Sequence, residues 1–345
     1  MKFSVGYQLP DEYDSMAELA QDHLAHISSV YYAAPGQPSA RSMIDKKAAS
    51  LQEEELSFLH SLGIALVMLY NANCYGSDAV SASFRAQILH DVSHAAELFG
   101  LRDVTTTSPF VAKTIKEHFP EIRVTASVNL WVGTEQAMEY LGKYFDSYYL
   151  QREYNRDFAR IRRLKRWCDT HGKTLRLLAN SGCLYTCPFH TFHDNMVAHE
   201  AQLCRKENGM GKYPSPCWEL MYHLDVAHAA ATFLQESWIR PQDVPAYAPY
   251  FSEMKLATRM HTSPRRVLSA YVRGKYSGNL LDLTEPSYAR RFDRHILDAT
   301  RFPDDWFEKT TTCAKNCESC GYCLRAAQQM LVEKRDLERQ YLSSF

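Results

Sequence analysis

The sequence lacks a long hydrophobic run, a net charge and a phosphate-binding glycine motif. Its longest uninterrupted apolar stretch, residues 64–70, is too short to cross a bilayer, so no membrane span is expected. Lys and Arg total 39 against 40 Asp and Glu, which argues against a general electrostatic attraction to nucleic acid or to an acidic membrane. No glycine-rich loop of the P-loop or Rossmann type occurs. The first ten residues contain no apolar core of the signal-peptide type, which predicts a cytoplasmic protein.

Cysteine is abundant and unevenly distributed. The ten cysteines form two groups and two single positions. One group lies between residues 183 and 217, and the other is Cys313, Cys317, Cys320 and Cys323. Cys74 and Cys168 stand alone. In a chain without a predicted signal peptide, such groups are more typical of metal binding or catalysis than of disulfides.

Short β-rich runs alternate with longer helical patterns over the first 300 residues. This alternation predicts βαβ units with a parallel sheet, and eight such units predict a closed (β/α)8 TIM-like barrel. The predicted strands cover residues 3–7, 28–33, 64–71, 103–107, 123–129, 147–151, 175–179 and 252–257. We expect residues 1–300 to form the barrel. Residues 301–345 are then a C-terminal cysteine-rich extension, with a helix over residues 324–342 that packs on the barrel.

Polar or reactive residues follow several of the predicted strands. In a β/α barrel the carboxyl ends of all strands share one rim, where the active site is found. We therefore predict substrate contacts for the strand-end residues Asn73, Asn129, Glu153 and Arg259. Asn73 and Glu153 have an alternative role, in which they only form hydrogen bonds within their loops.

The C-terminal motif, Cys-x3-Cys-x2-Cys-x2-Cys at residues 313–323, is a strong metal signal. Structural zinc usually takes two cysteine pairs separated by a dozen or more residues, and this spacing leaves no such loop. Closely repeated Cys-x2-Cys links are typical of a 4Fe–4S cluster. Zinc and unliganded thiols are the alternatives. The first three cysteines also have the spacing of radical S-adenosylmethionine enzymes, but Ser319 stands where those enzymes carry an aromatic residue, and a fourth cysteine would fill the open iron site.

The second constellation directly follows the seventh predicted strand. It is Asn180-Ser181-Gly182-Cys183-Leu184-Tyr185-Thr186-Cys187-Pro188, followed by His190 and His193. Two thiols in one rim loop can share one cluster or one zinc ion, and the two histidines could complete a zinc site.

These residues resemble ordered landmarks of the collagenase-like peptidase family U32. The segment that contains Cys183 and Cys187 is one landmark. The others are residues 124–129, 151–153, 237–244 and 254–259. The resemblance covers roughly residues 1–280. It implies a β/α barrel with a cysteine-ligated 4Fe–4S cluster, and relatives that hydroxylate RNA bases, or act in ubiquinone synthesis, without oxygen.

The chain departs from the family's cysteine pattern, because Pro245 occupies the position of the last family cysteine. We assign Cys183, Cys187 and Cys217 as ligands of the rim cluster. Cys74 is the predicted fourth ligand, Cys204 competes with it, and a cluster with one open iron is the remaining alternative. The four C-terminal cysteines would hold a second cluster, and Cys168 is interpreted as a core residue.

Residues 152–176 contain nine Lys and Arg. The interleaved apolar residues Phe158, Ile161, Leu164 and Trp167 predict an amphipathic outer helix of the barrel. A docking face for RNA or for an acidic protein is the alternative.

The sequence therefore predicts an iron–sulfur barrel enzyme with two 4Fe–4S clusters. It would carry out an oxygen-independent redox modification, such as hydroxylation, of a small molecule or a nucleobase. One alternative is an accessory protein whose clusters are structural and whose partner subunit carries the chemistry. The other is a peptidase, which needs an activated nucleophile or a metal-bound water.

Overall fold

The structure is a computed structural model that describes residues 1–10, 15–34, 36–39, 48–200 and 215–334. Its main sheet has eight parallel strands in the order β7-β6-β5-β4-β3-β2-β1-β8. The strands are β1 (Lys2–Gly6), β2 (Ile27–Ala33), β3 (Ala65–Tyr70), β4 (Asp103–Thr106), β5 (Arg123–Ala126), β6 (Ser147–Tyr149), β7 (Thr174–Arg176) and β8 (Glu253–Lys255). Every predicted strand is confirmed, with ends that differ by no more than three residues.

The sheet closes on itself between β7 and β8. Lys255 donates its backbone N–H to the carbonyl of Leu177 at 2.8 Å, and Ala179 donates to the carbonyl of Lys255 at 2.9 Å. A parallel bridge pairs Leu178 with Lys255. The predicted β/α barrel is therefore confirmed.

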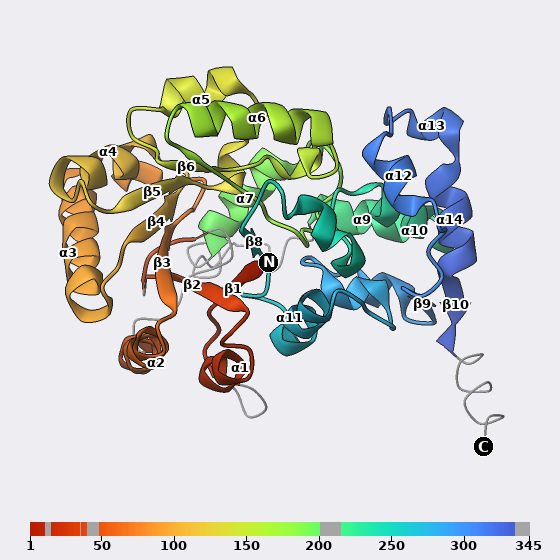
Figure 1. The fold of residues 1–345 in the computed structure, drawn as a ribbon, viewed down its shortest axis with the longest axis horizontal. Helices are drawn as coiled ribbons and strands as arrows, with labels where there is room; N and C mark the ends of the chain where they lie inside the picture. Colours follow the sequence, from red (N-terminus) through yellow and green to blue (C-terminus); the bar gives the residue numbers. More distant parts are fainter. Residues whose placement is uncertain (11–14, 35, 40–47, 201–214, 335–345) are drawn as a thin grey trace, which may run out of the picture.

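Helices surround this barrel on its outer side (Figure 1). Serine side chains cap several of them: Ser81 accepts a hydrogen bond from the N–H of Phe84 at the start of α3, and Ser108 caps α4 just before Pro109. Such caps satisfy N–H groups that have no partner within the helix. The surrounding helices are α1 (Met16–Asp22), α2 (Ala49–Ser61), α3 (Ala82–Phe99), α4 (Pro109–His118), α5 (Glu135–Leu141), α6 (Phe158–Thr170) and α11 (Pro264–Arg273).

A second layer of elements lies beside the barrel, at the right of Figure 1. It contains α9 (Pro216–His223), α10 (Val226–Gln235), α12 (Trp306–Thr311), α13 (Cys317–Cys320) and α14 (Tyr322–Met330), and a two-stranded antiparallel sheet of β9 (His295–Leu297) with β10 (Leu331–Glu333). Helix α7 (His190–Ala198) is drawn near the centre of Figure 1. Short 3-10 helices complete the described chain: η2 (Gly76–Asp78), η3 (Val128–Leu130), η4 (Arg152–Tyr154), η5 (Pro241–Tyr247), η6 (Leu280–Leu283) and η7 (Ala289–Phe292).

This second layer has its own hydrophobic core, in which α10 packs along α14. The rings of Trp238 and Trp306 stack within it, 6.3 Å apart. Residues from α10 and from β9 belong to this core. Residues before position 300 thus contribute to both hydrophobic cores.

The predicted helix over residues 324–342 is wrong at residues 331–333. There the chain turns extended, and β10 pairs antiparallel with β9, with Leu331 opposite Leu297. The carbonyl of Met330 accepts a hydrogen bond from Asp298 at 2.9 Å. Pairing with a strand distant in sequence overrides the local helical pattern here. Residues 335–342 lie outside the described part of the chain.

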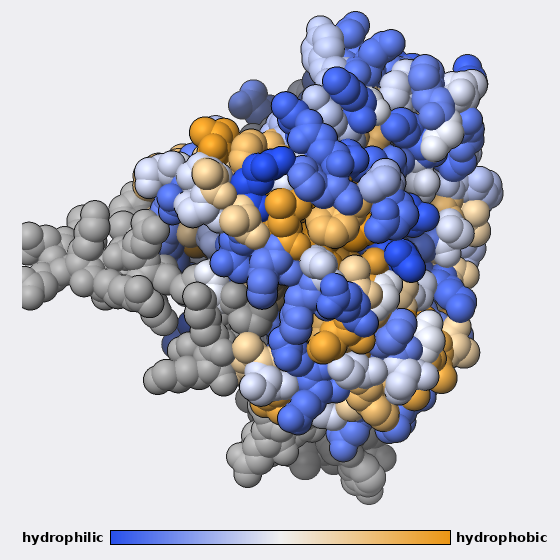
Figure 2. All heavy atoms as spheres, turned by 90° about the vertical axis from the view of Figure 1, so that its left-hand side faces the viewer, coloured by the Kyte–Doolittle hydropathy of each residue, from blue (hydrophilic) through white to orange (hydrophobic). Residues whose placement is uncertain are grey.

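Figure 2 shows the face on the α3 and α4 side, where small groups of apolar side chains lie among hydrophilic ones. No helix in the described ranges is long and apolar enough to cross a bilayer.

Candidate functional site

The carboxyl ends of the strands carry a hydrogen-bonded network centred on Arg152. This buried residue opens η4 after β6. Its Nη2 donates to Oδ1 of Asn129 at 2.9 Å, and its Nη1 lies 3.5 Å from Oγ of Ser181. The network thus joins the chain segments that follow β5, β6 and β7, as expected of the barrel rim.

His190, the first residue of α7, lies in the same network. Its Nε2 is 2.7 Å from Nη2 of Arg152 and 3.1 Å from Oδ2 of Asp194. The indole N–H of Trp131 donates to its Nδ1 at 2.8 Å. Because an indole can only donate, Nδ1 accepts here, and the guanidinium of Arg152, which is also only a donor, competes with the carboxylate of Asp194 for Nε2. Asn73 donates to the same carboxylate oxygen at 3.1 Å, so the predicted residues Asn73 and Asn129 meet in one network.

A cavity of about 630 Å³ adjoins this network. Its wall includes the three predicted ligands Cys183, Cys187 and Cys217, together with His190 and Asp194. The volume is in the range of small-molecule sites.

The segment that carries Cys183 is held by close backbone packing. Asn180 donates its side-chain amide to the carbonyls of Ala257 at 3.0 Å and Leu283 at 2.9 Å. A Cβ on Gly182 would collide with the carbonyl oxygen of Pro286. The Asn180-Ser181-Gly182 sequence therefore fixes the position at which the chain passes from the barrel into the loop that carries Cys183 and Cys187.

The three cysteines lie within electrostatic range of one another. Burial raises the pKa of the thiols of Cys187 and Cys217, so both favour the protonated form. The carboxylate of Glu236 lies within the same range of all three. Glu236 is fully buried, and neither of its oxygens has a hydrogen-bond partner among the described residues.

Cys74 does not line this cavity. Its half-buried thiol accepts a hydrogen bond from the backbone N–H of Gly76 at 3.4 Å. Cys204 lies outside the described residues. Cys168 is fully buried in the barrel core, where its Sγ is 4.0 Å from Sδ of Met138.

The four C-terminal cysteines surround the short helix α13. Cys317 interacts electrostatically with Cys313 and Cys320, and Cys323 with Cys313 and Cys317. Burial raises the pKa of Cys323 to about 11. The two cysteine groups are neighbours, because Nζ of Lys315 lies 4.7 Å from the ring of Tyr185, between Cys183 and Cys187 in sequence.

Both cysteine groups supply thiols, which are the preferred ligands of iron–sulfur clusters. A cubane of four irons carries its thiolates at its corners, so the residue types of both groups are compatible with the predicted clusters. Within the described part of the chain, no three His, Cys, Asp or Glu side chains converge closely enough to hold a single metal ion.

The two remaining predicted substrate residues lie elsewhere on the rim. Glu153 is buried beside a small cavity of about 10 Å³, bordered by Cys183 and Ser237. Its Oε2 has no hydrogen-bond partner in the described part of the chain. Arg259 follows β8 and packs against the end of β1, where a Cβ on Gly6 would lie 2.7 Å from the backbone nitrogen of Arg259.

Comparisons with known proteins agree with the barrel fold. No family model matches the chain. The uncharacterized protease MJ1657 of Methanocaldococcus jannaschii is 24% identical over 285 residues, which are 81% of each chain. The solved structure of the U32 peptidase Mk0906 superposes with a TM-score of 0.52 at 11% identity, over 75% of this chain and 92% of the other. The resemblance to family U32 is confirmed. At this identity the structural likeness concerns the fold.

Sequence reasoning missed three parts of this site. Arg152 directly precedes Glu153 in one of the landmark segments. Its position just after a predicted strand is the signal that could have identified it as a residue of the barrel rim. His190 was considered only as a zinc ligand, and its partner Trp131 was not considered. Glu236 gave no signal, because its burial depends on packing against residues distant in sequence.

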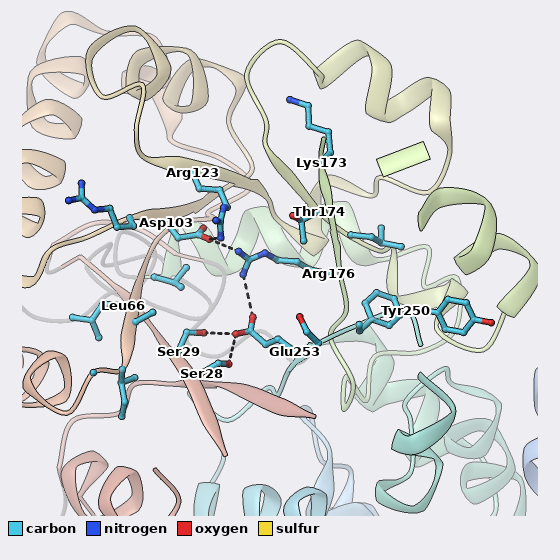
Figure 3. Close-up of a pocket in the computed structure, with 18 of the residues that line it drawn as sticks. Ser28, Ser29, Leu66, Asp103, Arg123, Lys173, Thr174, Arg176, Tyr250 and Glu253 are labelled. Carbon is cyan, nitrogen blue, oxygen red and sulfur yellow. Dashed lines mark hydrogen bonds and ion pairs between the residues drawn. The ribbon is translucent and has the colours of Figure 1, made fainter. Parts of the chain in front are cut away.

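A second cavity, of about 740 Å³, opens at the opposite end of the U32-like barrel (Figure 3). Arg176 lies between two carboxylates there, 2.5 Å from Oδ2 of Asp103 and 3.4 Å from Oε1 of Glu253. Glu253 also accepts hydrogen bonds from Ser28 and Ser29 (Figure 3). The charges pair with one another at the amino ends of the strands, an arrangement typical of a stabilising role in barrels.

Proposed function

We propose that the protein is an iron–sulfur enzyme of U32 type that carries out an oxygen-independent redox modification of a small molecule or a nucleobase, such as hydroxylation. One observation carries the proposal: three cysteines lie together in the wall of a 630 Å³ cavity at the carboxyl ends of the strands. Cys183, Cys187 and Cys217 would hold the rim cluster, and Cys313, Cys317, Cys320 and Cys323 the second. When bound, such clusters transfer single electrons.

The residues of the chain itself would bind and orient the substrate. His190 and Asp194 line the cavity, and Trp131 and Asn73 hold them in place. Nε2 of His190 lies between the guanidinium of Arg152 and the carboxylate of Asp194. Arg152 adds a buried positive charge next to this pair, which favours a substrate that carries or develops negative charge.

Anaerobic purification tests this proposal through the content of iron and acid-labile sulfide. We expect both in the protein, and a loss of about four irons in the double variant C183A/C187A. The matched control is C168A, which removes a buried thiol that lies in the barrel core and should leave the iron content unchanged. Stoichiometric zinc without acid-labile sulfide would overturn the proposal.

The accessory alternative makes a different prediction. If a partner subunit carries the chemistry, the isolated protein would hold its clusters but convert no substrate until the partner is added. Conversion of substrate by the isolated protein would contradict the accessory alternative.

A peptidase is the second candidate, favoured by one contact. Oγ of Ser215 lies 3.1 Å from Nε2 of His193, and both residues line the same cavity. A serine hydroxyl within hydrogen-bond reach of an imidazole is the basic unit of a nucleophile and its base. Hydrolysis of a fluorescent casein substrate that is abolished in S215A would support this candidate. S287A, in the same cavity wall, is the matched control, and equal rates in both variants would exclude Ser215 as the nucleophile.

A further inference from the structure

The second cavity, at the amino ends of the strands, carries an excess of basic side chains. It has a volume of about 740 Å³, in the range of small-molecule sites. Its wall contains the basic residues Arg102, Arg123, Lys165, Lys173 and Arg176, and the carboxylates of Asp103, Asp169 and Glu253. Pairing within the wall therefore leaves positive charge over.

Three of these basic side chains are held by the protein itself. Arg176 lies between two carboxylates (Figure 3). Lys165 pairs with Asp169 at 2.5 Å. Lys173 donates to two backbone carbonyls, at 2.9 and 2.7 Å. The donors of these three side chains thus already have acceptors.

The other two, Arg102 and Arg123, keep their donors free. They lie on neighbouring chain segments, because the backbone N–H of Arg123 donates to the carbonyl of Arg102 at 2.9 Å. The side chain of Arg123 is 54% exposed, and its Nη1 is 3.7 Å from Oδ2 of Asp103, which is beyond hydrogen-bond distance. Arg102 is exposed, and its guanidinium has no hydrogen bond or ion pair within the described ranges. Two adjacent arginines therefore offer N–H groups that no described group accepts.

We propose that this cavity binds a small organic anion, a phosphate ester or a carboxylate, whose oxygens Arg123 and Arg102 hold. A guanidinium presents its N–H groups in a planar fork that matches the oxygens of either group. Apolar side chains of the same wall, among them Leu66, Phe99 and Tyr250, form the surface for the organic part. The site lies at the opposite end of the barrel from the rim cavity, so it binds a second ligand and takes no part in the proposed reaction.

The carboxylates at the floor of the cavity are compatible with an anionic ligand. Asp103 and Glu253 share the charge of Arg176, and Glu253 also accepts hydrogen bonds from two serine hydroxyls (Figure 3). Arg123 lies close enough to Asp103 to compensate the second negative charge. The charges of Arg102 and Lys173 then remain without a carboxylate in the described part of the chain, and they make the cavity attractive to an anion.

The test titrates phenyl phosphate into the full chain at low salt, followed by isothermal titration calorimetry. We expect a Kd of about 1 mM or below, and weaker binding of inorganic phosphate, which has no apolar part. The double variant R102A/R123A removes charge-assisted hydrogen bonds and should weaken binding at least about tenfold. Benzoate is titrated in parallel. The tighter of the two organic probes then identifies the anionic group as a phosphate ester or as a carboxylate.

The matched control is R290A, which removes an exposed arginine from the wall of the rim cavity and should leave the affinity for phenyl phosphate unchanged. If R290A loses binding and R102A/R123A keeps it, the anion binds at the rim and the inference is wrong.

Two further results would overturn the inference. One is the absence of binding of either organic probe at about 10 mM, and the other is equal affinity for phenyl phosphate and inorganic phosphate. Should R102A/R123A not fold, R102A decides, because an exposed side chain without a partner can be removed with little loss of stability. An unchanged affinity of R102A would then contradict the inference. The iron content of the protein tests the proposed function separately.

Discussion

Arg156 donates two hydrogen bonds to the backbone carbonyl of Trp238, from Nε at 3.0 Å and from Nη2 at 2.6 Å. Its guanidinium also lies over the Trp238 ring, 4.8 Å from the centroid, and over the Trp306 ring at 5.3 Å. Arg156 follows β6, and both tryptophans belong to the second core. This contact therefore connects the second layer to the barrel. The same side chain interacts electrostatically with Glu236 and with Cys323, one beside each cysteine group.

Replacement of Arg156 by methionine should therefore destabilise the protein. The buried carbonyls of Trp238 and Leu234 would lose their donors, at a cost of about 1–3 kcal/mol each. We expect the free energy of unfolding, measured with urea, to fall by about 3 kcal/mol. Arg163, which is half exposed and paired with Glu135, provides the control R163A, with an expected change within about 0.5 kcal/mol. Equal stabilities of the two variants would contradict this role of Arg156.

The C-terminal cysteines should hold about half of the iron. Cys313 and Cys320 are exposed, and Cys317 and Cys323 are half-buried, so a cluster there lies near the surface of the second layer. The double variant C317A/C320A should reduce the iron content from about eight to about four per chain. The barrel should remain folded, because its core does not include these residues. An unchanged iron content would show that this group binds no cluster.

The substitution C74A tests whether Cys74 is the fourth ligand of the rim cluster. If Cys74 is not a ligand, as its place outside the cavity wall suggests, C74A should keep the full iron content and sulfide content. A loss of about four irons in C74A would instead identify Cys74 as a ligand. C204A is measured in parallel, because Cys204 was the competing candidate. If only C204A loses iron, Cys204 is the ligand that the sequence pattern left open.

Lys255 should make stability depend on pH. Burial, with repulsion from Arg259 and Arg176, lowers its pKa to about 7, and its Nζ lies 3.7 Å from the centroid of the Tyr31 ring. In the unfolded chain the pKa is about 10.4. Between about pH 7 and pH 10 the unfolded chain thus binds a proton that the folded chain does not, so the free energy of unfolding rises with pH in this window.

The variant K255M removes this contribution. In urea unfolding at pH 6.5, 8 and 9.5, we expect a flatter pH dependence in K255M than in the unchanged protein. At pH 6.5 the buried amine of Lys255 becomes protonated in the folded protein, which lowers the free energy of unfolding. The free energy of unfolding of K255M should therefore exceed that of the unchanged protein by the largest amount at this pH. Parallel pH profiles would show that the amine of Lys255 keeps an ordinary pKa.

The barrel could be predicted because each strand is a local pattern. Strand β3, for example, is a continuous apolar run followed by Asn71 and Asn73, and the shared rim then follows from the topology. Strand β10 could not be predicted in the same way, because Leu331 and Val332 become a strand only by pairing with residues 295–297. Glu236 was also hidden, since a glutamate at the end of an apolar helix normally faces water.

The charge pairing of α6 leads to a prediction on nucleic acid. Arg163 pairs with Glu135 at 2.6 Å, and Lys165 with Asp169 at 2.5 Å. Lys173 donates to the backbone carbonyls of Gly142 and Phe145. Several basic side chains of residues 152–176 are therefore already engaged within the protein, and Ile161 and Leu164 bury the other face of the helix.

We therefore expect this stretch to bind RNA weakly and with a shallow dependence on salt. A site that neutralises several phosphates would lose affinity steeply as the salt concentration rises. Filter binding of a transfer RNA and of a ribosomal RNA fragment at salt concentrations between about 50 and 200 mM measures this slope. Over this range, a site with several phosphate contacts loses affinity by orders of magnitude, whereas weak nonspecific contact changes little. The triple variant R162A/R163A/R166A should change the measured affinity little. Tight binding that disappears in this variant would contradict the expectation, and would identify α6 as the surface that presents an RNA base to the rim.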